Sequence, residues 1–325
     1  MISPAADPRT TLIDLRRQFA QGDISRETFW QHMREHHRAL EAYAGALGEG
    51  EVDGITIEAG GFTIRLRNGL AFHWDADDLR SAPNMVLNHG EYEAKDMRLL
   101  LALARDSRVI FDIGANVGWH ALHLLTAAPA DARLYAFEPV PTTFERLKRN
   151  LAANDGVYTF RICATNIAFA AETGTATFFI PRVSGSSAAS QRPLFSGDEN
   201  KTVTCALHRL DDFVVEQGIS TIDLIKCDVE GAELFVFKGG YETISRSTPM
   251  IFVEMLRKWA RAFGYHPNDT ISLLAQCGYQ CWYFEDGRLN LLPVMTDDTR
   301  ETNFLFLHRE RHVDMPARIS SMDVA

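Results

Sequence analysis

Two glycines and two acidic residues carry the clearest chemical signal in this sequence. A short apolar run ends at Asp112, and Gly114 and Gly118 then bracket a turn before a helical pattern. Glycine lets the backbone approach a ligand and adopt positive φ, and the free N–H groups at the start of a helix attract an anion. The next strand ends in Glu138-Pro139, where a carboxylate can accept hydrogen bonds from both hydroxyls of a ribose. The pattern predicts a site for a nucleoside-containing cofactor.

The spacing of the glycines separates two classes of cofactor. A dinucleotide-binding loop follows the pattern G-x-G-x-x-G, whose middle glycine admits the pyrophosphate. Here residues 114–118 read GANVG and lack that middle glycine. The loop therefore disfavours NAD.

An acidic segment follows a later strand and makes the pattern more specific. The run Ile222–Cys227 reads as a central strand and leads to DVEGAE at positions 228–233. Together with Asp112, the glycine loop and Glu138, this segment resembles the S-adenosylmethionine-dependent methyltransferases, and among them the FkbM family. The resemblance extends over roughly residues 90–308. It implies S-adenosylmethionine as cofactor and an α/β, Rossmann-like class I methyltransferase fold: a mostly parallel seven-stranded sheet with helices on both faces.

The acids after the central strand are candidates for the chemistry of methyl transfer. Transfer from a sulfonium is an in-line displacement, so the protein mainly has to align the reacting atoms. A hydroxyl acceptor must also lose a proton, which a carboxylate within hydrogen-bond reach can accept. We predict that Asp228 or Glu230 orients or deprotonates the acceptor, because ligands of an open α/β sheet bind beyond the carboxyl ends of its strands. In an alternative, these two acids and Glu254 hold Mg²⁺ through their oxygens, but our prediction assigns no metal.

The remaining predicted site residues bind the cofactor. Residues 114–118 cradle the methionine part, Glu138 holds the ribose, and Asp112 fixes the loop. The family resemblance adds Glu91, in a Y-E element at the mouth of the cofactor site, and residues 165–166, because the loop after the third strand lies against the adenine in this class. The predicted cofactor set is Glu91, Asp112, Gly114, Asn116, Gly118, Glu138, Pro139, Thr165, Asn166 and Asp228.

Composition limits the compartment and the partners. The chain has 325 residues, of which 46% are hydrophobic, and this is ample for a buried core. Its net charge of −10 and the absence of a basic block argue against nucleic acid and anionic membranes as partners. The sequence has no secretory signal pattern, and no apolar run reaches the roughly 18 residues of a membrane span. We predict a cytoplasmic enzyme with a small-molecule acceptor and five reduced cysteines.

Four segments follow one another along the chain. Apolar residues at helical spacing from Thr11 to Leu47, interrupted near Gly22, predict two helices that pack on the catalytic domain, form a homodimer contact or cover the substrate. Alternating apolar residues around Asn68-Gly69 predict an antiparallel hairpin. The predicted segments are 1–50 (helical), 51–88 (antiparallel β), 89–310 (methyltransferase domain) and 311–325 (flexible tail).

Three functions are compatible with these observations. The first is O-methylation of a hydroxyl on a sugar, a polyketide or another secondary metabolite. The second is methylation of a carboxylate or amine, which needs no strong base. The third is a non-catalytic binding protein, which the intact set of Gly114, Glu138 and Asp228 argues against.

The Ser-rich stretch 182–200 is predicted to be a lid near the substrate.

Overall fold

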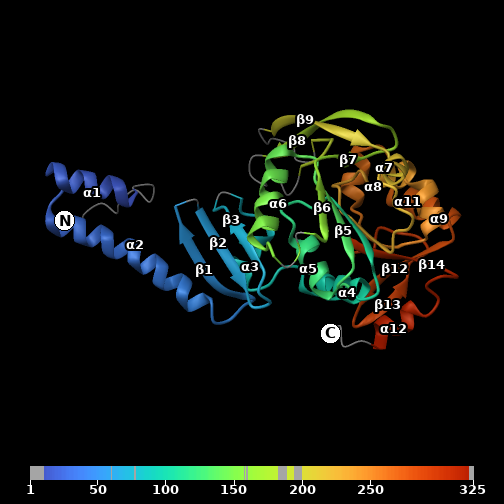
Figure 1. The fold of residues 1–325 in the computed structure, drawn as a ribbon, viewed down its shortest axis with the longest axis horizontal. Coiled ribbons are helices and arrows are strands. Elements are labelled where there is room, and N and C mark those ends of the chain that lie inside the picture. Colours follow the sequence, from blue (N-terminus) through green and yellow to red (C-terminus); the bar gives the residue numbers. More distant parts are fainter. Residues whose placement is uncertain are drawn as a thin grey trace.

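The computed structural model describes residues 11–59, 61–76, 78–156, 158, 160–181, 189–193 and 200–321. A two-helix arm, a small antiparallel sheet and a large α/β domain follow one another from the N-terminus (Figure 1). Most of the predicted lid, 182–188 and 194–199, lies outside the described residues. Among the helices of the described part, none combines the length and the hydropathy needed to cross a bilayer.

The large domain is built on an eight-stranded sheet with the order β13-β12-β14-β11-β10-β4-β5-β6. Five neighbouring strands, from β11 to β6, are parallel, and β14 inserts antiparallel beside β11. This is the strand order of the class I methyltransferase fold, so the predicted fold class is confirmed. The strands are β4 (Val109–Ile113), β5 (Arg133–Phe137), β6 (Ile162–Thr165), β10 (Leu224–Cys227), β11 (Met250–Glu254), β12 (Tyr279–Glu285), β13 (Arg288–Leu291) and β14 (Asn303–His308).

The prediction of seven strands was one too few. The turn at Asp286-Gly287, with φ of 48° and 75°, folds β13 back onto β12 as an eighth, edge strand. Two consecutive residues with positive φ suit a tight hairpin whose twist matches that of its strands.

Helices cover both faces of the sheet because its strands are apolar on both sides. Alternate strand residues such as Ile110 and Leu134 pack under α4, α5, α6 and α12. Strand residues that face the other side, such as Phe111 and Phe137, pack under α7, α8, α9 and α11. The helices of the domain are α3 (Ala82–His89), α4 (Ala94–Ala104), α5 (Trp119–Ala127), α6 (Pro141–Ala153), α7 (Leu210–Glu216), α8 (Glu233–Gly239), α9 (Tyr241–Ser247), α10 (Arg257–Ala262), α11 (Pro267–Gln276) and α12 (Met315–Ser321).

A second small sheet packs against the connection between β5 and α6. It consists of β7 (Ala168–Phe169), β8 (Gly174–Pro181) and β9 (Asn200–His208), in the order β7-β9-β8. Its buried residues include Phe178 and Cys205, which pack with Val140 at the end of the β5–α6 connection. This sheet therefore lies next to the segment that follows Glu138.

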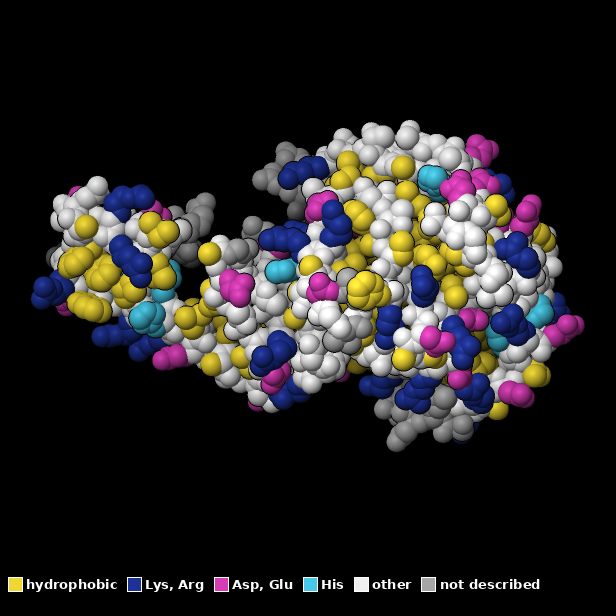
Figure 2. Space-filling view, viewed as in Figure 1, with side chains coloured by type: hydrophobic (Ala, Val, Ile, Leu, Met, Phe, Trp, Pro, Cys, Tyr) yellow, Lys and Arg dark blue, Asp and Glu magenta, His cyan; other side chains and the backbone are white. Residues whose placement is uncertain are grey.

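The two predicted N-terminal helices are present and form the arm. They are α1 (Leu12–Gln21) and α2 (Arg26–Ala46), and the Ser25 hydroxyl accepts a hydrogen bond from the Thr28 N–H at the start of α2. The arm extends away from the rest of the chain (Figure 1) and exposes hydrophobic side chains (Figure 2), Trp30 and Leu40 among them.

The predicted hairpin is also present, in the sheet β1-β2-β3, and α6 fixes its position. The strands are β1 (Val52–Glu58), β2 (Gly61–Leu66) and β3 (Ala71–Trp74). The side-chain oxygen of Asn150 accepts a hydrogen bond from His73 N (2.7 Å), and that of Asn154 accepts one from Ala71 N (2.9 Å). Asn150 also donates to Val117 O (2.7 Å), so this buried amide joins the small sheet to the cofactor loop. The exact boundary between the antiparallel segment, 51–88, and the methyltransferase domain, 89–310, stays a prediction.

The prediction of a flexible tail from residue 311 is wrong for the described part of that segment. Residues 315–321 form α12, whose Met315 and Ile319 are buried against the sheet. Arg311 adds a hydrogen bond from Nη1 to Ser247 O at 2.8 Å. The sequence pattern missed this helix because only two of its residues face the core, too few to establish a periodicity.

Replacing Ile319 by alanine tests whether α12 belongs to the folded core. The side chain is 1% exposed, so the change should lower the free energy of unfolding by about 2–5 kcal/mol. Val313→Ala removes an apolar side chain that is 68% exposed and should change it by less than about 0.5 kcal/mol. Urea unfolding of both variants measures this, and equal, small effects would mean that α12 contributes nothing to stability.

Candidate active site

The glycine loop adopts its conformation because the chain on either side leaves no room for side chains. Gly114 has φ of 80°, and a Cβ there would lie 1.8 Å from the carbonyl oxygen of Asp228. Gly118 has φ of 88°, and a Cβ there would lie 2.6 Å from Leu147 Cδ1. The backbone contact therefore requires glycine at position 114, whereas at position 118 it is the positive φ that favours glycine, because the end of the Leu147 side chain can move.

Glu138 is held by the backbone of the loop that it faces. Its Oε2 accepts a hydrogen bond from Asn116 N (3.0 Å) and its Oε1 accepts one from Val140 N (2.9 Å). The residue is 6% exposed, and this burial raises the pKa of the carboxyl to about 7, against the two hydrogen bonds that lower it. Each oxygen keeps a further lone pair for a ligand hydroxyl.

A buried lysine, which the sequence analysis did not single out, connects two strand ends. Lys226 lies opposite Asp112 in the pairing of β10 with β4. Its Nζ lies 3.3 Å from Asp112 Oδ1 and 3.6 Å from Asp228 Oδ2, and it donates a hydrogen bond to Gly114 O (3.0 Å). Burial alone would lower the pKa of Lys226, but the two carboxylates raise it above its ordinary value. A charged residue in an otherwise apolar central strand is a signal that could have revealed it, because such residues are buried only when paired.

Three acids, Asp228, Glu230 and Glu254, meet at the carboxyl ends of β10 and β11. Burial, followed by the charge of Asp228, raises the pKa of Glu254 to about 9 and that of Glu230 well above its ordinary range. Glu230 also has φ of 54°, and its buried Oε2 has no hydrogen-bond partner among the described residues. With a pKa of about 9, Glu254 holds a proton at neutral pH. Asp228 lies beside the Lys226 charge.

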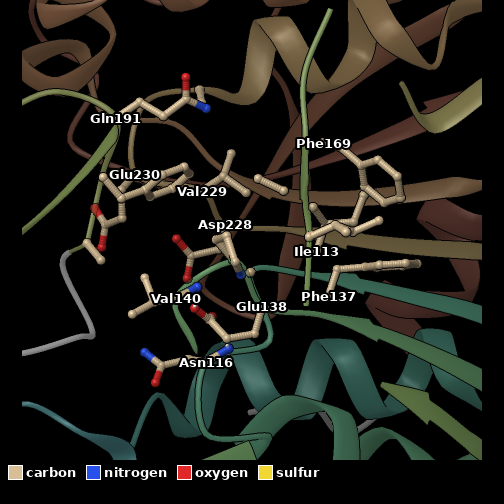
Figure 3. Close-up of a pocket in the computed structure, with 17 residues that line it drawn as sticks. Ile113, Asn116, Phe137, Glu138, Val140, Phe169, Gln191, Asp228, Val229 and Glu230 are labelled. Carbon is tan, nitrogen blue, oxygen red and sulfur yellow. Dashed lines mark hydrogen bonds between the residues drawn. The ribbon is translucent and has the colours of Figure 1, made fainter. Parts of the chain in front are cut away.

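Two connected hollows surround these groups. The first, with a volume of about 600 Å³, has Glu138, Asn116 and Asp228 gathered on one side and Phe137 and Phe169 on the other (Figure 3). We call it the cofactor hollow. The second, of about 830 Å³, lies on the other side of the loop and includes Lys226, Glu254 and Trp259 in its lining. We call it the catalytic hollow.

A histidine and a glutamate face the same acids from across the catalytic hollow. His120 Nε2, at the start of α5, lies 3.2 Å from Glu93 Oε2. Burial alone would raise the pKa of Glu93, but its hydrogen bond with His120 brings the pKa below the ordinary value. Glu93 has φ of 49°, which is a strained conformation for a non-glycine residue. Sequence reasoning missed this pair because nothing in the local pattern links the residue before α4 with the start of α5.

Several predicted cofactor residues lie elsewhere. Glu91 lines a separate hollow next to Glu51, and Glu93, two residues later, takes the place that we predicted for it. The reason is the turn before α4, which directs the two side chains differently. Of the two acids around Tyr92, Glu93 and not Glu91 therefore faces the cofactor loop.

The residues after the third strand also differ from their predicted role. Thr165 is the last residue of β6, and its carbonyl accepts a hydrogen bond from Glu138 N (3.2 Å). The Asn166 side chain donates to the carbonyls of Glu138 and Pro139 (2.7 and 2.9 Å). Both therefore fix the segment around Glu138, and the next residues, Ile167 and Ala168, line the cofactor hollow instead.

The other predicted residues divide between lining and support. Gly114, Asn116, Glu138, Pro139, Asp228 and Glu230 line the cofactor hollow. Asp112 is fully buried and Gly118 lies under the loop, so these two position the loop, which for Asp112 is the role that we predicted. In the described part of the chain, no group of three or more His, Cys, Asp or Glu residues is arranged to hold a metal ion. All five cysteines are free, as predicted.

Comparison with known proteins gives a consistent result. Residues 112–281 match the family model of the methyltransferase FkbM domain. The chain is 35% identical over 155 residues to methyltransferase sdnD of Sordaria araneosa, covering 40% of this chain and 59% of sdnD. It is 32% identical over 168 residues to the 2-O-methyltransferase NoeI of Sinorhizobium fredii (48% and 67% covered). It is 27% identical over 233 residues to the hexuronic acid methyltransferase AglP of Haloferax volcanii (71% and 82% covered).

Replacing Lys226 by methionine tests its role in holding the site together. The change leaves Asp112 and Asp228 without their cation and should lower the free energy of unfolding by about 3–5 kcal/mol. The double variant Lys226→Met with Asp112→Asn removes the uncompensated buried charge and should recover part of that loss. Urea unfolding of the three proteins measures the difference, and a single variant as stable as the unmodified protein would contradict the assignment.

Proposed function

The chain belongs to the FkbM family of methyltransferases, and on that premise we propose that it transfers a methyl group from S-adenosylmethionine to a hydroxyl of a sugar, a polyketide or another secondary metabolite. One observation carries the proposal. The cofactor hollow and the catalytic hollow share Gly114, Asn116, Asp228 and Glu230 in their linings. A cofactor on the loop and an acceptor in the catalytic hollow therefore meet beside the acids of β10.

The residues of the cofactor hollow fit S-adenosylmethionine. The Glu138 carboxylate suits the ribose hydroxyls, and Ile167 and Phe169 form an apolar wall for the adenine. The buried Oδ1 of Asn116 has no hydrogen-bond partner among the described residues and is available to a ligand donor. When bound, the cofactor supplies an electrophilic methyl group on a sulfonium.

The protonation pattern of the acids supports Asp228 over Glu230 as the base. A carboxyl that already holds a proton cannot accept one. Burial keeps Glu254 protonated at neutral pH, and burial together with the Asp228 charge shifts the pKa of Glu230 in the same direction. Asp228, 3.6 Å from the Lys226 ammonium, is left to accept the proton of the acceptor hydroxyl. The O–H groups of Glu230 and Glu254 can donate hydrogen bonds to the acceptor and orient it.

The names of two relatives bear on the acceptor. NoeI is a 2-O-methyltransferase and AglP acts on a hexuronic acid, which supports a sugar as acceptor. A hexuronic acid offers a carboxylate as well as hydroxyls, so carboxyl methylation is a second candidate function. A carboxylate needs no base, and this distinguishes the two reactions.

The cellular compartment, the size of the acceptor and the oligomeric state are also proposed here. We place the enzyme in the cytoplasm, in keeping with its five free cysteines. The acceptor is a small molecule. A homodimer formed through the exposed apolar residues of the arm is a further expectation, supported by Trp30 and Leu40, which are 60% and 53% exposed.

Replacing Asp228 by asparagine separates binding from transfer. We expect the affinity for S-adenosylmethionine to change by less than about threefold, and transfer to hydroxyl acceptors to slow by about 10²–10⁴-fold, because the base is lost. Calorimetric titration measures the first, and release of S-adenosylhomocysteine with a panel of glycosides and hydroxylated metabolites measures the second. Asp131→Asn, at an exposed ion pair, is the control.

The outcomes of this experiment separate the candidate functions. Unchanged transfer in Asp228→Asn would remove the base assignment and favour a carboxylate acceptor. If the unmodified protein does not bind S-adenosylmethionine even at millimolar concentration, the proposed function itself is wrong.

The ribose contact predicts a pH dependence of cofactor binding. Since the pKa of Glu138 is about 7, the carboxylate is mostly protonated at pH 6 and mostly charged at pH 8. Affinity for S-adenosylmethionine should therefore fall by up to about tenfold as the pH drops from 8 to 6. Glu138→Gln should bind about tenfold or more weakly than the unmodified protein at pH 8 and lose most of this pH dependence. Equal pH slopes in both proteins would assign the dependence to another group.

A further inference from the structure

A third hollow, of about 910 Å³, lies beside the catalytic hollow, between the small sheet and α6. We call it the side hollow. Val117 of the cofactor loop lines both the side hollow and the catalytic hollow. Elsewhere a single stretch of chain separates them, since Arg80 and Ala82 line the catalytic hollow whereas Ser81 and Pro83 line the side hollow. A ligand longer than one ring can therefore extend from one hollow toward the other.

One wall of the side hollow is aromatic and rigid. Trp74 packs edge-on against Phe62 of β2 and Tyr43 of α2, with ring centroids 5.1 and 5.9 Å apart. Its indole N–H donates a hydrogen bond to Asn84 Oδ1, which fixes the ring. One face of a sugar ring carries mainly C–H groups, and such an apolar face packs well against a fixed indole.

The opposite wall carries planar polar groups from α6 and the end of β3. Arg146 forms ion pairs with Asp75 and Asp78, so its position is fixed. Arg149, one turn later on α6, has no hydrogen-bond or ion-pair partner among the residues that the structure describes. Lys and Arg side chains and a histidine gather where β3 meets α6 (Figure 2). Arg149 is therefore available to a ligand.

The side hollow contains charges of both signs. Asp75, 46% exposed, is ion-paired with Arg146 and lies in the same lining as Arg149, so a ligand there meets a carboxylate as well as guanidinium groups. Burial, followed by the Arg149 charge, lowers the pKa of His73, so its ring is neutral at pH 7. The lining thus offers donors and acceptors together. Sugar hydroxyls, which donate and accept, match such a set.

We propose that the side hollow binds a sugar unit of the acceptor next to the unit that is methylated. This inference rests on the proposed function and narrows its acceptor to an oligosaccharide or a glycoconjugate. Trp74 stacks on the neighbouring ring, and Arg149 and Asp75 bind its hydroxyls. The small sheet, which supplies the aromatic wall, is then part of the substrate site.

The experiment measures binding by the full chain loaded with S-adenosylhomocysteine. An array of plant and microbial oligosaccharides identifies the glycan that binds best, and calorimetry then compares this glycan with its isolated terminal sugar. We expect the longer glycan to bind at least about tenfold more tightly. Arg149→Ala and Trp74→Ala should remove most of that advantage and leave the affinity for S-adenosylmethionine unchanged. Lys148→Ala removes a neighbouring exposed cation of α6 and should leave the advantage intact.

Three results would overturn the inference: no glycan on the array binds, the isolated sugar binds as tightly as the longer glycan, or Lys148→Ala and Arg149→Ala lose the advantage equally. Arg149 is an exposed residue, so its variant remains informative even if Trp74→Ala unfolds. The S-adenosylmethionine titration and the transfer assay are read separately. A protein that binds cofactor and transfers methyl groups without any effect of glycan length refutes only the side-hollow inference.

Discussion

The site depends on one buried cation that lies between two strand ends. Lys226 contacts carboxylates from β4 and from the end of β10, and it also donates to the carbonyl of Gly114 in the cofactor loop. Parallel pairing of the two strands places Lys226 directly opposite Asp112, so the ion pair follows from strand register. A desolvated charge needs close partners to be tolerated. The loop, the strand ends and Asp228 are therefore fixed together by the same requirement.

Lys226 carries one positive charge and cannot neutralise all the acidic residues around it. The carboxyl groups of the site therefore differ in their tendency to hold a proton. Asp228, Glu230 and Glu254 crowd the carboxyl ends of β10 and β11, and only Asp228 lies within ion-pair distance of Lys226. Burial and mutual repulsion raise the pKa of the other two, to about 9 for Glu254. One cluster of like residues thus combines an ion-paired carboxylate with carboxyls that favour the protonated form, and the proposed role of Asp228 as proton acceptor rests on this difference.

The N-terminal segments take part in the same arrangement although they lie outside the matched family region, residues 112–281. Asn150 and Asn154 of α6 satisfy backbone groups of β3, and Asn150 also binds the carbonyl of Val117. A sheet edge that is satisfied by buried side chains is held firmly in place. The small sheet consequently presents Trp74 beside the cofactor loop.

The sequence by itself determined the features that depend on neighbouring residues. The glycine loop, Glu138 at a strand end, the two N-terminal helices and the Asn68-Gly69 hairpin follow from local spacing and backbone preference. The alternation of strands and helices, together with the family resemblance, was enough to predict the fold class. These features need no knowledge of what packs against them.

Only the tertiary structure decided the features that depend on contacts between distant segments. It assigned the place near the loop to Glu93 rather than Glu91, made Thr165 and Asn166 supports for Glu138, and paired Lys226 with Asp112. It also placed α12 on the sheet where the sequence suggested a tail. In each case the deciding quantity was burial next to a residue far away in the chain, because burial sets which charges must be paired and which carboxyls keep a proton.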